Sequence, residues 1–188
     1  MPDQIHSPAS PLAEISLNKE SSPRLIILSG PSGAGKSTWC SRLTQQAIDA
    51  ELIVGGLISR AVFVDGVKVG IELVDQLSGE CRRLAVRRSE ARDGLKTEQW
   101  ILDPAVLDWG NQQLLALSPC DIIILDELGP QELERGRGLQ TALKLIESRR
   151  MAVIVAVVRP KLLSEARLRW PWAEVLALVG DRAVAGAG

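Results

Sequence analysis

The sequence predicts an α/β fold in which a mostly parallel sheet is flanked by helices. Unbroken apolar runs at residues 25–28, 122–125 and 151–158 are typical of strands that are buried on both faces. Segments with helical features alternate with these runs, and residues 175–179 add a last strand. Strands that alternate with helices imply parallel crossovers, because each helix must return the chain to the same edge of the sheet.

Three further strand-like segments between residues 52 and 88 predict an antiparallel β-meander inserted after the first helix. The dipeptides Asp65-Gly66 and Ser78-Gly79 separate these segments, and both favour the tight turns of hairpins. The meander therefore extends the sheet by a different kind of pairing.

Helix signals follow the strands in order. The first helix begins after Lys36, and a second begins at Pro104 with Asp103 as its N-cap. Residues 131–150 are predicted to form one helix, although two internal glycines weaken it, and residues 161–169 a short one.

Length and composition indicate one domain behind a leader. Residues 1–22 carry prolines, serines and acids without apolar periodicity, so we expect a flexible leader there and a single domain over residues 23–188. The formal net charge of -1 gives no overall attraction to nucleic acid or anionic lipid. No apolar run approaches the roughly 20 residues that cross a bilayer, and no secretory signal is recognisable, so we expect a cytoplasmic protein.

A glycine-rich loop between the first strand and the first helix has the Walker A (P-loop) spacing G-x-x-x-x-G-K-S. Glycines let the backbone curl until successive N–H groups point at phosphate oxygens, and the helix N-terminus adds its positive end. Lys36 would reach the β- and γ-phosphates, and Ser37 would place its hydroxyl on Mg²⁺. The spacing predicts a nucleoside-triphosphate site formed by Gly30, Pro31, Ser32, Gly33, Ala34, Gly35, Lys36, Ser37 and Thr38.

Two carboxylates end the apolar strand at residues 122–125 in a Walker B pattern. The carboxyl ends of parallel strands meet at one edge of a sheet, so we expect Asp126 and Glu127 near the glycine-rich loop. Asp126 would hold Mg²⁺ through a water, and Glu127 would orient or deprotonate the attacking water. Lys36 and Glu127 are thus the candidate catalytic residues, and Ser37 and Asp126 the candidate metal ligands.

Phosphoryl transfer also gains from a cation that faces the developing charge. The sequence does not choose among four candidates: Arg60, Arg135, Arg137 and Arg159. A basic run around the last meander strand holds further arginines, but acidic residues are interspersed and no aromatic residue interleaves to stack a base. We therefore do not expect nucleic acid as a partner.

With both nucleotide motifs and the meander placed, the chain resembles the small P-loop nucleoside-triphosphatase family that includes the cancer-related nucleoside triphosphatase. The likeness extends over most of residues 24–182, and residues 126–133 look like the family's extended Walker B segment. The resemblance implies a Rossmann-like P-loop sheet similar to that of nucleotide kinases, with hydrolysis of several nucleoside triphosphates to diphosphate and phosphate. Two departures are Ala61, where we expect an acidic residue, and Gln131, where methionine is usual.

Two other activities stay open on the residues alone. A nucleotide or small-metabolite kinase would share every phosphate contact and add an acceptor pocket. A nucleotide-gated binding protein would use slow turnover to reset a partner interaction. No short motif encodes base preference or oligomeric state, and residues 18–21 do not fit the guanine-reading pattern N-K-x-D.

Overall fold

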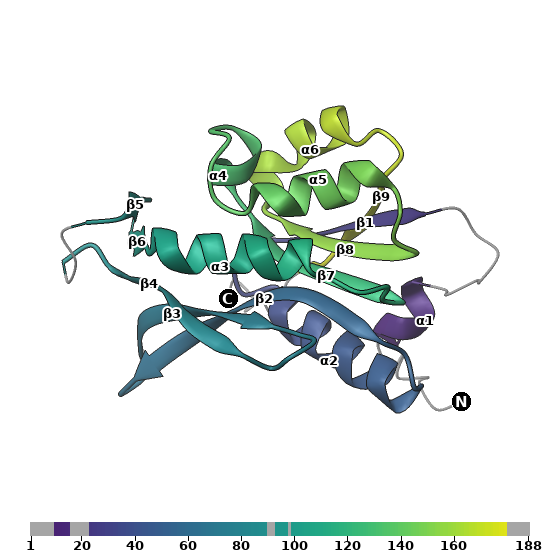
Figure 1. The fold of residues 1–188 in the computed structure, drawn as a ribbon, viewed down its shortest axis with the longest axis horizontal. Coiled ribbons are helices and arrows are strands. Elements are labelled where there is room, and N and C mark those ends of the chain that lie inside the picture. The colour runs from purple at the N-terminus through teal and green to yellow at the C-terminus, as the bar shows by residue number, and fades with distance from the viewer. Residues whose placement is uncertain (1–9, 16–22, 90–92, 98, 180–188) are drawn as a thin grey trace, which may run out of the picture.

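The computed structural model describes residues 10–15, 23–89, 93–97 and 99–179 (Figure 1). Within these residues the chain forms one sheet of nine strands, in the order β5-β6-β4-β3-β2-β7-β8-β1-β9, with helices against it. This architecture confirms the predicted α/β class. The sheet divides into a parallel half and an antiparallel half that meet at β2.

The parallel half consists of four strands and the first part of a fifth: β1 (Arg24–Ser29), β7 (Ile122–Leu128), β8 (Val153–Val158), β9 (Glu174–Ala177) and β2 (Val54–Val64). Strand β8 lies between β1 and β7 and pairs in parallel with both. Every residue of β8 is buried, as expected for a strand covered on both faces.

The antiparallel half contains the predicted meander, which runs from β2 through β3 (Val67–Asp75) to β4 (Cys81–Arg87). Two short strands that the sequence did not indicate, β5 (Leu95–Lys96) and β6 (Trp100–Leu102), continue it. Only residues 54–57 of β2 pair with β7. The remainder of β2 therefore carries the meander past the ends of the parallel strands.

Side chains that alternate along β1 divide the core into two clusters. Ile26 and Leu28 pack with α2 (Lys36–Asp49), whereas Leu25 and Ile27 belong to the cluster under three other helices. These are α3 (Pro104–Leu115), α5 (Gln140–Ser148) and α6 (Leu163–Arg169). The predicted N-cap of α3 is confirmed, because the Asp103 side chain accepts from the Ala105 N–H.

The expectation that residues 1–22 lie outside the fold is wrong at helix α1 (Pro11–Ile15). Ile15 is buried in the α2 cluster, and the Gln46 side chain accepts from the Leu12 N–H and the Ser10 hydroxyl. A helix this short shows too few turns for apolar periodicity, so packing on α2 rather than local pattern accounts for it. The rest of that segment falls outside the described residues.

The predicted helix over residues 131–150 is also wrong as one element. It divides into α4 (Pro130–Leu133) and α5, joined by a loop in which Gly136 and Gly138 adopt φ of 61° and 74°. A positive φ is incompatible with a continuing right-handed helix, so the glycines break the helix instead of merely weakening it. No helix in the described residues is long and apolar enough to cross a membrane.

Candidate functional site

The glycine-rich loop, residues 30–37, connects the end of β1 to the start of α2. Gly33 and Gly35 adopt φ of 81° and 82°, a left-handed conformation that side chains disfavour. A Cβ on Gly30 would meet the Leu178 carbonyl oxygen at 2.6 Å, so the loop packs closely on the chain that follows β9. Gly33 and Gly35 are therefore required by backbone conformation, and Gly30 by close packing.

Backbone N–H groups of this loop are available to a ligand. Across the described residues, the N–H groups of Gly33, Gly35, Lys36 and Ser37 donate to no protein acceptor, whereas the Ala34 N–H donates to the Pro31 carbonyl. Free N–H groups at a helix N-terminus, with glycines that turn them to one side, form a site for anionic oxygens. The loop backbone thus offers N–H groups where the motif predicts phosphate, and the assignment of phosphate to them stays a prediction.

The Lys36 ammonium lies over the same loop. Its Nζ donates to the carbonyl oxygens of Gly30 and Pro31, at 2.6 and 2.8 Å. An ammonium has three N–H donors, so one remains for a phosphate oxygen while two hold the side chain across the loop. Ser37 and Thr38 follow in the first turn of α2 and are exposed, so the Ser37 hydroxyl is accessible to a metal bound with the phosphates.

Asp126 is a buried carboxylate near the carboxyl end of β7. Its Oδ2 accepts from the Ser59 N–H at 3.3 Å, where β2 passes alongside. Ile124 of β7, two residues earlier, packs in one cluster with Cys40 and Leu43 of α2. Burial and, to a smaller extent, the Asp126 charge raise the pKa of the Cys40 thiol, in agreement with this placement. The structure therefore brings Asp126 to the same helix end as Lys36 and Ser37.

The spacing of the strands leaves room between the loop and the carboxylate. Because β8 separates β1 from β7, the two motifs start from strands about 10 Å apart, twice the usual distance between neighbours. No group of three or more metal-binding side chains occurs in the described residues. One carboxylate and one hydroxyl nevertheless suit Mg²⁺, which takes its other ligands from substrate phosphates and water.

Glu127 follows Asp126 within β7, at a point where the pairing with β8 shifts register. Its backbone lies at the edge of the sheet where the parallel strands have their carboxyl ends, as the sequence predicts. Its side chain is not among the described parts of the chain. The catalytic role of Glu127 stays a prediction.

The four candidate arginines occupy different places. Arg60 lies on the meander, where its guanidinium binds Glu72 at 2.8 Å, and this hydrogen bond raises the pKa of Arg60. Arg135 and Arg137 lie in the loop between α4 and α5. Arg159 directly follows β8, between the two motif-bearing strands. Topology thus favours Arg159 over Arg60 as the cation at the reacting phosphate.

Sequence reasoning missed Glu132, a buried carboxylate beyond the Walker B segment. It accepts from the N–H of Gly129 at 2.9 Å and from the N–H of Leu139 at 3.0 Å. Asn111 of α3 adds two contacts, donating to the Gly138 carbonyl and accepting from the Thr141 N–H. These side chains hold the arginine-bearing loop closed at the end of β7. The Gly129 N–H contact is the glutamate half of a capping box, and because Gly129 has no side chain to supply the other half, the sequence carried only a weak signal for it.

Comparisons with known proteins agree with this geometry. Residues 25–174 match the model of the NTPase family. The nucleoside-triphosphatase THEP1 of Methanothermobacter thermautotrophicus is 31% identical over 146 residues, which are 77% of this chain and 81% of the relative. The protein of the same name from Archaeoglobus fulgidus is 36% identical over 112 residues, 58% of this chain and 62% of the relative, so that match spans less than two thirds of its length.

A solved structure supports the fold. The solution structure of a human cancer-related nucleoside triphosphatase superposes with a TM-score of 0.63 at 21% identity, covering 82% of this chain and 88% of that one. The family match extends over both motifs, the meander and the segment after Asp126, all of which carried the resemblance seen in the sequence. The chain therefore belongs to the NTPase family of P-loop nucleoside-triphosphatases.

Proposed function

We propose that this protein hydrolyses nucleoside 5'-triphosphates to diphosphate and phosphate in a Mg²⁺-dependent reaction with broad base tolerance. The observation that carries the proposal is the set of loop N–H groups that have no protein acceptor among the described residues, at the start of α2, where Lys36 is held by two carbonyls of the same loop. The names of the two archaeal relatives support the same activity.

Each residue has a physical role in this proposal. The loop N–H groups and Lys36 bind the β- and γ-phosphate oxygens and neutralise their charge. Ser37 and Asp126 would hold Mg²⁺, which supplies Lewis-acid stabilisation of the phosphates. Glu127 orients a water for in-line attack, in which the bond from the water oxygen to the γ-phosphorus forms as the bond to the β,γ-bridging oxygen breaks. The water proton passes to the Glu127 carboxylate.

Phosphate release from ATP, GTP, CTP and UTP, measured with and without Mg²⁺, tests the proposal. We expect release from all four nucleotides, loss on chelation, and a decrease of at least about 100-fold in Lys36→Ala, since a preorganised charge contact is removed from the transition state. Lys144→Ala is the matched control, because Lys144 is exposed on α5. No release above background from any nucleotide would overturn the proposal, and phosphorylated product formed only with an added acceptor would favour a kinase.

A further inference from the structure

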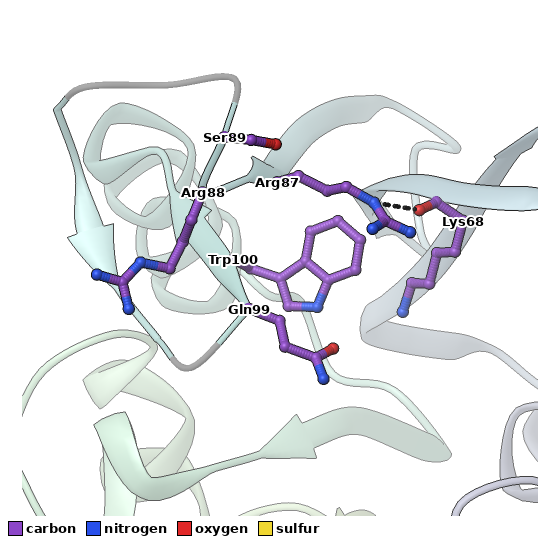
Figure 2. A pocket seen from close by; sticks show the side chains of 6 residues that line it. All are labelled: Lys68, Arg87, Arg88, Ser89, Gln99 and Trp100. Carbon is purple, nitrogen blue, oxygen red and sulfur yellow. Dashed lines mark hydrogen bonds between the residues drawn. The ribbon is translucent and has the colours of Figure 1, made fainter.

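A pocket of about 550 Å³ opens on the antiparallel half of the sheet (Figure 2). Its volume lies within the range of roughly 300–1,000 Å³ that is common for small-molecule sites. We call it the cationic pocket, and it is lined by Lys68, Arg87, Arg88, Ser89, Gln99 and Trp100. None of the described residues that line it is acidic, and three of them are cationic, so this lining favours an anionic ligand.

Trp100 forms the aromatic centre of the cationic pocket. It lies on β6 directly opposite Arg87 of β4, and Figure 2 shows its indole between the Lys68 and Arg87 side chains on one side and Arg88 on the other. The Lys68 Nζ is 5.1 Å and the Arg87 guanidinium carbon 6.0 Å from the ring centroid. Arg87 Nε donates to the Lys68 carbonyl at 3.0 Å, which holds the guanidinium in place and leaves its terminal nitrogens for a ligand.

The positive charge of this pocket is not neutralised by the described residues. Elsewhere in the antiparallel half, arginines are paired with carboxylates: Arg60 and Arg83 with Glu72, and Arg82 with Glu80. Within the described ranges, by contrast, no carboxylate forms an ion pair with Lys68, Arg87 or Arg88. Two of these cations, Lys68 and Arg87, therefore lie over the Trp100 indole, and none of the three has a carboxylate partner among the described residues.

We propose that the cationic pocket binds a nucleotide unit, with its phosphate on Lys68, Arg87 and Arg88 and its base stacked on Trp100. Guanidinium groups bind phosphate oxygens in a bidentate manner, and an indole face stacks any base. The nucleotide unit comes from a free mononucleotide or from a single-stranded nucleic acid. The basic run in the sequence lacked an aromatic partner, and folding supplies one from a different strand.

This pocket is a second site rather than part of the first. In the sheet order, β6 lies six strand spacings from β1, which is about 28 Å along the sheet. One nucleoside triphosphate cannot fill both places. The inference therefore goes beyond the proposed function and does not depend on it.

Fluorescence anisotropy with a labelled single-stranded 12-mer, and calorimetry with AMP, test the proposal on the full chain. We expect the double variant Lys68→Gln/Arg87→Gln to bind the 12-mer at least tenfold more weakly and to lower the slope of log affinity against log salt by about 0.7 for each lost phosphate contact. Trp100→Leu should weaken binding at least fivefold, because stacking is lost. Binding of AMP alone would identify a free nucleotide as the source, and binding of the 12-mer would identify a strand.

Two controls separate this site from the glycine-rich loop and from general charge. Arg83→Gln removes one positive charge from the same half of the sheet, against two in the double variant, and Lys36→Ala disables the loop. Both should bind the probes within about twofold of the parent. The proposal is overturned if the parent binds neither probe below about 1 mM, if Lys36→Ala abolishes binding, or if the pocket variants bind like the parent. It is equally overturned if inorganic polyphosphate binds as tightly as the 12-mer and Trp100→Leu has no effect, since the site would then take any polyanion.

Discussion

The two halves of the sheet create binding geometry in different ways. In the parallel half, the glycine-rich loop uses backbone N–H groups from consecutive residues, and its lysine is held by carbonyls of the same loop. In the antiparallel half, the cationic pocket uses side chains from β3, β4 and β6, or next to them, and the backbone serves mainly to place them. A local backbone site can be read from a motif, whereas a site of converging side chains depends on strand pairing.

The largest difference that we expect between the two halves is in turnover, when a glutamate of each half is replaced by glutamine. Glu127→Gln should lower phosphate release by about 100- to 10,000-fold with nucleotide affinity retained, because the attacking water loses its base. Glu72→Gln, on the meander, should leave the rate within twofold, because an exposed ion pair contributes little. Single-turnover rates and nucleotide titrations check both. Parent-like turnover in Glu127→Gln would remove this residue from the mechanism.

Glycines in the two halves should differ in their effect on stability. Gly56 has φ of 102° where β2 meets β7, and a Cβ there would lie 2.1 Å from the Ile124 carbonyl oxygen. We expect Gly56→Ala to lower the free energy of unfolding by about 3 kcal/mol or more. Gly66→Ala, in the hairpin turn with open space around it, should cost about 1 kcal/mol from its positive φ alone. Urea unfolding measures the difference, and equal costs would contradict a tight contact between the halves.

Gln131 connects the two halves, and replacing it should make the fold more stable. Its side chain is buried, its Nε2 donates weakly to the Lys96 carbonyl at 3.4 Å, and its Oε1 has no partner among the described residues. Gln131→Met removes an unsatisfied buried acceptor, so we expect about 1 kcal/mol more stability. Urea unfolding checks the sign, with the exposed Gln112→Met on α3 as the matched control. A loss of stability in Gln131→Met alone would show that the contact to Lys96 matters more.

The smallest expected effect concerns the ion pair at the edge of the parallel half. A hydrogen bond from Arg24 lowers the pKa of Glu174, so the pair stabilises the fold above the ordinary carboxyl pKa of 4.5 and the stabilisation is lost as pH falls through the lowered value. Because Glu174 is largely exposed, we expect Glu174→Gln to cost at most about 0.5 kcal/mol at pH 7 and less at pH 3. Thermal unfolding at both pH values tests this, and a cost that grows at pH 3 would contradict it.

Local turn and cap chemistry was predictable because it depends on neighbouring residues. Asp65-Gly66 forms the first hairpin turn, with positive φ at both positions. Asp103 caps α3, as the sequence Asp103-Pro104 predicts. The short helix α1 and the break at Gly136 were not predicted. Helix α1 depends on contacts with α2. The glycines at 136 and 138 permit the break, and contacts with Glu132 and Asn111 hold the resulting loop.

The sequence by itself determined the glycine-rich loop, the acidic end of β7 and the meander, because each rests on residue types at fixed short spacing. Only the tertiary structure decided that β8 separates the two nucleotide motifs and that Asp126 lies beside α2. It also decided that Trp100 meets cations from two other strands. Strand order and cross-strand pairing join residues that are distant in the chain, and no local pattern records which strands will pair.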